Sequence, residues 1–249
     1  MEHTDLKAGI SLVLLAYNEE ENLRVLLPRI KEQLNKCGED YELLVIGGQT
    51  DEDNSREVCE AEGAVYMNQE EPGFGGAFRT GIRHAKRQKF FIMDSDGSHH
   101  PRYIPDIYHC FMDKRCDVAI GSRYTKGGVS NDSITSQIMS HTLNFVYGMI
   151  LGVKAKDLST DFRMYHTRRL KEVVDDLKCP HYDVLQEVIL LLKLRKKKEH
   201  KKFTIAETPI TFDKRLFGIS KRKLLTFIIS YMKTVFYLSS IRWKNRKIR

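Results

Sequence analysis

The stretch KFFIMDSDGSHHP, residues 89–101, decides the fold class and concentrates the chemistry at one point. An apolar strand over 90–93 runs directly into two acids, Asp94 and Asp96. Alternate residues of an extended segment point to the same side, so both carboxylates aim at one place. Such a pair suits a hard cation such as Mg²⁺ or Mn²⁺. A turn in which Asp94 caps the next helix is the alternative, and the two histidines of the stretch either ligate the ion or pack beside the proline.

Strands and helices alternate on both sides of this stretch. We expect strands at 10–16, 41–46, 64–67, 90–93 and 118–121, and helices from 18 or 22 to 36 and over 51–62, 75–86 and 101–113. This alternation predicts an α/β fold, with a mostly parallel sheet and helices on both faces. Ligands of such sheets bind outside the carboxyl ends of the strands. Four polar motifs fall at such ends, at 17–19, 47–48, 94–96 and 121–123.

The pattern changes after about residue 130. We expect helices over 134–151, 168–176 and 182–194, a strand over 203–212 and a long amphipathic helix over 224–241. That last helix is a little short for a span and carries a lysine, so we expect it to lie on a membrane or a partner. An ordinary docked terminal helix is the alternative. The expected division is a catalytic domain over 1–219, followed by the amphipathic helix and basic tail over 220–249.

Charge and cysteine content restrict the partners and the compartment. The net charge is +8, and positive residues gather in 193–202 and 242–249. Anionic lipid, nucleic acid and phosphorylated substrates all attract such a surface. Nucleic acid is not expected, because Asp94 and Asp96 would repel its phosphates unless a metal were present. Five scattered cysteines and an N-terminus without a signal-like segment predict reduced thiols in the cytosol.

Several short motifs follow one another in a specific order. They are AYNEEEN (16–22), GFGGA (73–77), MDSDGSHHP (93–101), GSRY (121–124), Gly127-Gly128, DLSTDFR (157–163) and PITF (209–212), then Arg215, Gly218, Ser220 and Lys221. In this order they resemble the family-2 glycosyltransferases of GT-A fold. The closest resemblance is to the dolichol-phosphate mannose synthase and polyprenyl-phosphate glycosyltransferase group, and it covers about residues 11–221.

The resemblance implies a GT-A, Rossmann-like enzyme. It would transfer a sugar, with inversion, from a nucleoside-diphosphate-sugar to a dolichyl or undecaprenyl phosphate, using Mg²⁺ or Mn²⁺ bound by Asp96 and Asp94. The implied catalytic residues are Asp94, Asp96, Arg123 and Arg163. The implied donor-binding residues are Ala16, Tyr17, Asn18, Glu19, Gly75, Gly76, Asp94, Ser95 and Asp96. The implied phosphate- or acceptor-binding residues are Arg123, Arg163, Arg215, Ser220, Lys221 and Asp161.

Two departures from the family pattern bear on activity. Ile46 and Gly47 stand where the family has acids that contact the base and ribose, and only Asp51 remains. This departure keeps open a catalytically impaired nucleotide-binding homologue. The second departure is Asp161, where the family usually has glycine. A phosphate acceptor needs no base, because its second pKa is about 6. A hydroxyl acceptor does need one, and Asp161 as base keeps that alternative open.

The C-terminal segment predicts the cellular location of the protein. The helix over 224–241 is followed by Trp243 and a basic tail, which favour the interface of an anionic membrane. We therefore expect a cytoplasmic protein that is peripheral on the cytosolic face of a membrane. Association with a second copy or with a membrane partner subunit stays open.

Overall fold

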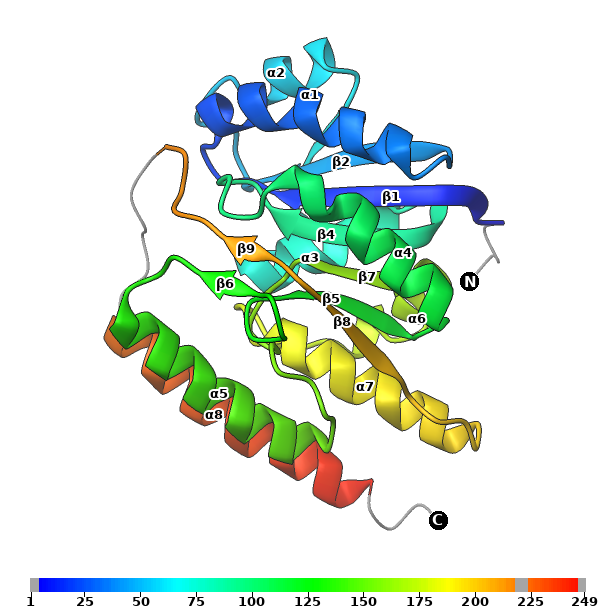
Figure 1. Cartoon of the computed structure of the whole chain (residues 1–249), viewed down its shortest axis with the longest axis vertical. Helices are drawn as coiled ribbons and strands as arrows, with labels where there is room; N and C mark the ends of the chain where they lie inside the picture. The colour runs from blue at the N-terminus through cyan, green and yellow to red at the C-terminus, as the bar shows by residue number, and fades with distance from the viewer. Residues whose placement is uncertain (1–4, 218–223, 246–249) are drawn as a thin grey trace.

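The computed structural model of the chain describes residues 5–217 and 224–245, without the side chains of 224–232 (Figure 1). Ser220 and Lys221, two expected acceptor residues, lie outside this part.

A seven-stranded sheet has the order β3-β2-β1-β4-β7-β5-β8. Its strands are β1 (Lys7–Leu15), β2 (Tyr41–Gly47), β3 (Val65–Asn68), β4 (Arg87–Asp94), β5 (Val118–Ser122), β7 (Arg163–His166) and β8 (Ile205–Pro209). All pairs are parallel except those of β7, which lies antiparallel between β4 and β5. Two short strands, β6 (Val129–Ser130) and β9 (Thr211–Phe212), form a separate parallel pair. The predicted mostly parallel α/β sheet is therefore confirmed, but β7 was not predicted.

Helices cover both faces of the sheet, as predicted. They are α1 (Glu20–Lys36), α2 (Ser55–Ala61), α3 (Gly73–His84), α4 (Ile104–Lys114), α5 (Ile134–Leu151), α6 (Thr167–Lys171), α7 (Val184–Lys198) and α8 (Leu224–Lys244), with 3₁₀ turns at Pro101–Tyr103 and Val174–Asp176. Strand β4 shows why two layers form. Phe91 and Met93 join the core under α1, α2 and α4, whereas Phe90 and Ile92 face α3 and α7 on the other side.

Helix α2 begins four residues later than the sequence predicts, because the loop before it makes other contacts. Asp53 accepts hydrogen bonds from the backbone N–H groups of Glu20 and Ser55. The same carboxylate therefore joins the first residues of α1 and α2. Asp51 accepts from the side chains of Arg56 and Asn68. These side chains hold the loop against the carboxyl end of β2.

Helix α8 lies beside α5, and the two form a layer along one edge of the molecule (Figure 1). Leu238 of α8 is fully buried in the core that also contains α3, α5 and α7. Phe236 and Trp243 of the same helix are exposed. One face of α8 therefore packs against the core, and the other face is exposed to solvent. Within the described residues, no helix is long and apolar enough to cross a membrane.

Candidate functional site

A pocket of about 890 Å³ opens at the carboxyl ends of β1, β2 and β4. Of the expected donor-binding residues, those that line it are Ala16, Tyr17, Asn18, Glu19, Asp94, Ser95 and Asp96. Of the expected phosphate-binding residues, Arg215 lines it too. The structure therefore brings together residues separated by about two hundred positions along the chain.

Asp96 is held by the turn that follows β4. One carboxylate oxygen accepts hydrogen bonds from the backbone N–H of Ser98 at 2.9 Å and from its hydroxyl at 2.5 Å. Gly97, with φ +83°, takes the left-handed conformation that this turn requires. The other oxygen of Asp96 lies 3.0 Å from the guanidinium of Arg215. Asp96 is thus a fixed carboxylate that already has a positive partner.

The segment around Arg215 contributes Arg215 and Phe217 to the lining of the pocket. The guanidinium of Arg215 also lies 3.9 Å from the carboxylate of Glu19, which lines the same pocket. The backbone N–H of Leu216 donates to the carbonyl of Asp96 at 3.0 Å. Arg215 is 30% exposed, so it reaches solvent as well as the two acids. It can therefore exchange a carboxylate for a phosphate without a large rearrangement.

A second cluster lies behind Asp94. Nδ1 of His99 is 3.6 Å from Asp94 and 3.5 Å from Asp161. Burial first, and then the nearby Asp94 carboxylate, raise the pKa of Asp161 well above its usual range. Burial lowers the pKa of His99. One ligand atom from each of these three side chains lies within 4.8 Å of the others, although Nδ1 of His99 already accepts the backbone N–H of Asp94 at 3.2 Å.

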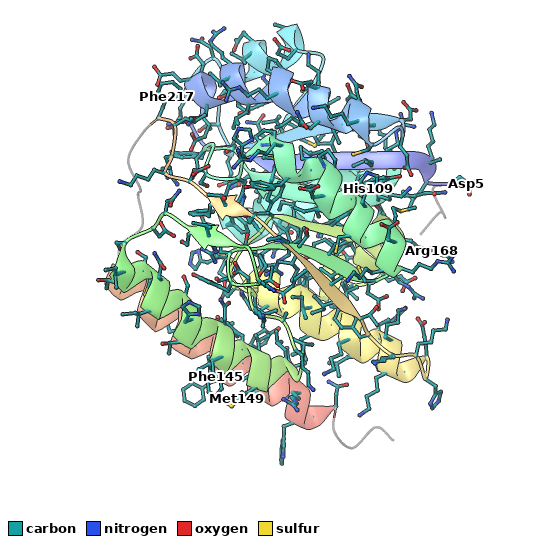
Figure 2. All side chains as sticks on the ribbon, viewed as in Figure 1. Asp5, His109, Phe145, Met149, Arg168 and Phe217 are labelled. Atoms are coloured by element: carbon teal, nitrogen blue, oxygen red, sulfur yellow. The ribbon has the colours of Figure 1, made fainter. Side chains whose placement is uncertain are left out.

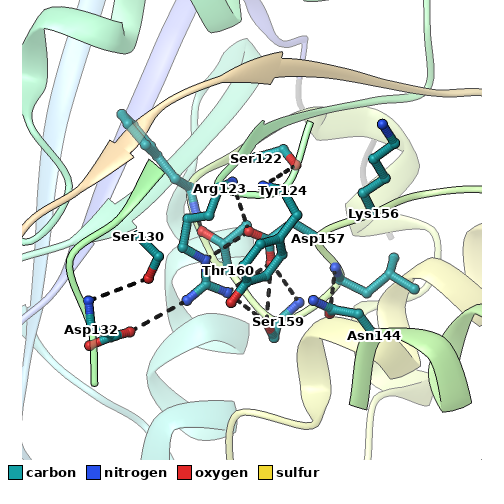
Figure 3. Close-up of polar contacts among 12 residues, drawn as sticks. Ser122, Arg123, Tyr124, Ser130, Asp132, Asn144, Lys156, Asp157, Ser159 and Thr160 are labelled. Atoms are coloured by element: carbon teal, nitrogen blue, oxygen red, sulfur yellow. Dashed lines mark hydrogen bonds and ion pairs between the residues drawn. The ribbon is translucent and has the colours of Figure 1, made fainter. Parts of the chain in front are cut away.

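Arg123 has a carboxylate partner from another segment (Figure 3). Its guanidinium donates two hydrogen bonds to Asp157, both at 2.8 Å, and one to Ser159 at 2.6 Å. Arg123 is 7% exposed and its guanidinium also lies over the ring of Phe212. Arg123 does not line the pocket. Its contacts fix the 157–161 segment against the end of β5.

Arg163 is fully buried on β7. Its guanidinium donates to the backbone carbonyls of Leu158 at 2.6 Å and Leu185 at 2.9 Å. A phosphate could not reach this group without opening the core, so the structure contradicts the expected direct phosphate contact. Arg163 instead ties the 157–163 segment to the first turn of α7.

Gly75 and Gly76 also do not line the pocket. A Cβ on Gly75 would lie 2.0 Å from the carbonyl oxygen of Cys179, and one on Gly76 would lie 1.9 Å from that of Glu71. The backbone N–H of Gly75 donates to the carbonyl of Pro180 at 2.9 Å. The glycines therefore permit close approach of other backbone segments to α3 rather than of a ligand, which corrects their expected donor-binding role.

The first turn of α3 and the segment before α7 supply pocket residues that the sequence did not reveal. Phe74 stacks on Tyr182, with ring centroids 4.2 Å apart, and both line the pocket next to His181. The stacked pair joins positions about one hundred residues apart, so no local pattern could have indicated the pairing. The only local signal was Phe74 itself, an aromatic residue inside the glycine motif at 73–76.

The loop after β2 shows what replaces the missing acids. A Cβ on Gly47 would lie 1.9 Å from the hydroxyl oxygen of Tyr66, so the tyrosine fills the space of any side chain there. Further along the loop, Glu52 accepts hydrogen bonds from Tyr17 at 3.0 Å and from Asn18 at 2.9 Å. Asp53 lines the pocket. An acidic side chain therefore remains in the pocket lining, but it is Asp53, while Glu52 holds the side chains of Tyr17 and Asn18.

Comparisons with known proteins agree with this architecture. Residues 11–174 match the profile of the family described as Glycosyl transferase family 2. The chain is 30% identical to the dolichol-phosphate mannosyltransferase of Pyrococcus furiosus, over 94% of this chain but only 64% of that protein. It is 28% identical to the polyprenol monophosphomannose synthase of Mycolicibacterium smegmatis, over 84% of this chain and 79% of that protein.

A solved structure shares the fold. It is the glucosyl-3-phosphoglycerate synthase of Mycobacterium tuberculosis in complex with Mn²⁺, uridine diphosphate and glucosyl-3-phosphoglycerate. The TM-score is 0.71 at 16% sequence identity, over 94% of this chain and 80% of that one. The likeness extends beyond the segment matched by the family profile and includes most of the second half of the chain.

Proposed function

The chain belongs to glycosyl transferase family 2, and on this premise we propose that it moves a sugar from a nucleoside-diphosphate-sugar to a polyprenyl phosphate, with inversion. The observation that carries the proposal is one pocket in which Asp94 and Asp96 face Tyr17 and Arg215. The aromatic ring can stack on the base of a nucleotide-sugar, and the two acids can hold a metal ion on its diphosphate. The arginine can bind a phosphate of the donor or of the acceptor. The names of the two mannosyl-transferring relatives support the lipid acceptor.

The donor would lie along the wall formed by β1 and the loop after β2. Tyr17 is half exposed beside the pocket and offers a ring face on which a base can stack. Asp53, which lines the pocket, offers an acceptor for ribose hydroxyls or base N–H groups. A Mg²⁺ or Mn²⁺ ion held by Asp94 and Asp96 would neutralise the diphosphate as it leaves. The Mn²⁺ bound by the mycobacterial enzyme of the same fold supports this cofactor.

The acceptor supplies its own nucleophile. A phosphate oxygen attacks the anomeric carbon, the bond from that carbon to the diphosphate oxygen breaks, and the electron pair leaves with the nucleoside diphosphate. Arg215 can orient either phosphate through its planar fork of donors. Asp161 is 4% exposed and lies behind Asp94, outside the pocket lining. It is therefore badly placed to deprotonate a hydroxyl, and no observation favours that acceptor.

The function is tested with the purified full chain, Mn²⁺, a series of GDP- and UDP-sugars and a polyprenyl phosphate. One donor is expected to raise the melting temperature, because a ligand that binds only the folded state stabilises it. The same donor is expected to yield a lipid-linked sugar that mass spectrometry detects. Stabilisation by a donor without transfer to any polyprenyl phosphate would instead support the impaired nucleotide-binding homologue.

We also propose that the protein is peripheral on an anionic membrane, through the layer of α5 and α8. The exposed apolar residues of α5 are spaced by four, seven and four positions, which places them on one face. They are Ile134, Ile138, Phe145 and Met149, and Phe145 and Met149 point outward in Figure 2. Phe236 and Trp243 of α8 are exposed as well, and Arg242 and Lys244 add positive charge beside them. This combination suits an anionic lipid surface.

Co-sedimentation with anionic vesicles at low salt measures this association. The double variant Phe145→Glu/Met149→Glu is expected to weaken binding by at least about tenfold, because burying one large apolar side chain contributes about 1.5–3 kcal/mol. Met112→Glu is the matched control, since Met112 is exposed on α4, away from this layer. Equal vesicle binding by the double variant and the control would rule out this surface.

A further inference from the structure

Both carboxylate oxygens of Asp96 are already engaged in this structure. Oδ1 accepts the two hydrogen bonds from Ser98, and Oδ2 lies 3.0 Å from the guanidinium of Arg215. The side chain of Asp96 is only 10% exposed, so little water surrounds this ion pair. A carboxylate that is buried to this extent needs a positive partner. Arg215 supplies that charge from the chain itself.

A divalent ion and Arg215 compete for the same oxygen of Asp96. An ion bonded to Oδ2 at about 2.1 Å would lie at most about 5 Å from the guanidinium nitrogen. Like charges at that separation repel each other strongly where little water separates them. The ion cannot use Oδ1 instead unless the two hydrogen bonds from Ser98 break. Metal binding at Asp96 therefore requires the Arg215 side chain to move away.

The backbone on both sides of Arg215 is fixed, so only the side chain needs to move. The N–H of Leu216 donates to the carbonyl of Asp96 at 3.0 Å. The N–H of Asp213 donates to the carbonyl of Ser98 at 2.9 Å. These two hydrogen bonds hold the segment against the turn after β4. The guanidinium therefore stays within reach of the metal position whichever anion it pairs with.

We propose that Arg215 is an internal counter-ion that closes the metal position of the free protein and opens it when the donor diphosphate draws the guanidinium away. The inference rests on the proposed function, because it takes the diphosphate of the donor as the competing anion. Arg215 is 30% exposed and lies 3.9 Å from Glu19 as well, so its side chain can turn within the pocket. Metal and donor then bind cooperatively, since each removes the cost that Arg215 imposes on the other.

The test uses the full chain with Mn²⁺ alone, titrated by the loss of the free-ion signal in electron paramagnetic resonance. The wild type is expected to bind Mn²⁺ weakly in the absence of nucleotide. Arg215→Gln, which removes the charge, is expected to bind it about ten- to a hundredfold more tightly, the range for one hydrogen bond to a charged group. Arg215→Lys retains a positive charge and is expected to bind as weakly as the wild type.

Two further variants show where the increase arises. Arg169→Gln removes a positive charge of similar exposure, 28% against 30%, from α6. Because α6 follows the antiparallel strand β7, it lies at the opposite end of the sheet from the pocket, and this variant is expected to bind Mn²⁺ as the wild type does. Adding Asp96→Asn to Arg215→Gln is expected to abolish the increase, because the ion loses its ligand. An increase in affinity that a second substitution removes does not result from misfolding.

The donor provides a measurement of opposite sign. At saturating Mn²⁺, the donor is expected to raise the melting temperature of Arg215→Gln less than that of the wild type, because the diphosphate has lost its arginine. The proposal is overturned if Arg215→Gln binds Mn²⁺ no more tightly than the wild type, if the increase persists in the double variant, or if the donor stabilises both proteins equally. Failure to transfer sugar to any polyprenyl phosphate would refute the proposed function instead, since the Mn²⁺ titrations need no donor.

Discussion

Replacing Asp96 with asparagine is expected to lower the rate of sugar transfer by about a hundred- to a thousandfold, the range observed when one group that stabilises transition-state charge is lost. Asparagine keeps the acceptor oxygen that Ser98 bonds, but it removes the negative charge that would hold the metal and now pairs with Arg215. The loss should therefore be in kcat, with circular dichroism and melting temperature close to those of the wild type.

Asp96→Ala would change stability as well as activity, because Asp96 is 7% exposed and accepts two hydrogen bonds from Ser98. Leaving those donors unpaired costs about 1–3 kcal/mol. Asp132→Asn is a suitable control, since that carboxylate lies 3.9 Å from Arg123 and does not line the pocket. A folded Asp96→Asn protein that transfers sugar at the wild-type rate, with the metal chelated, would refute the assignment of the donor site.

Replacing Leu238 with alanine is expected to destabilise the whole protein by about 2–5 kcal/mol, the usual cost of a cavity at a fully buried leucine. Leu238 belongs to the same core as α3, α5 and α7. Polar contacts hold the same helix in place, since Tyr237 donates to the buried Glu187 at 2.9 Å and Arg242 donates to carbonyls at the end of α5. Deleting α8 would remove all of these contacts, so it would report on folding rather than on lipid binding.

Phe236→Ala is the matched control two positions away on the same helix. Phe236 is 70% exposed, so its loss should change stability by no more than about 0.5 kcal/mol. Thermal or urea unfolding compares the two variants, and vesicle co-sedimentation should rank them in the opposite order. Equal unfolding midpoints would show that α8 does not contribute to the core in solution.

The sequence predicted the parts of this structure that are determined locally. The apolar strand before Asp94 and the spacing of Asp94 and Asp96 place both acids at the carboxyl edge of the sheet, and the structure confirms that position. The four residues of β7 are too few to show the alternation of apolar and polar side chains that identifies a strand. Arg123 pairs with Asp157, which is thirty-four residues away. Arg163 donates to the backbone carbonyl of Leu185, which only the folded chain brings near. Pairing over such separations has no local pattern.

The contact between Gly47 and Tyr66 has a consequence for how this sequence can change. Because a Cβ at residue 47 would lie 1.9 Å from the tyrosine hydroxyl oxygen, the ring of Tyr66 must shift before an acid can return there. A smaller residue at position 66 would in turn leave a hole beside Gly47. The two positions are therefore expected to co-vary among descendants of this chain.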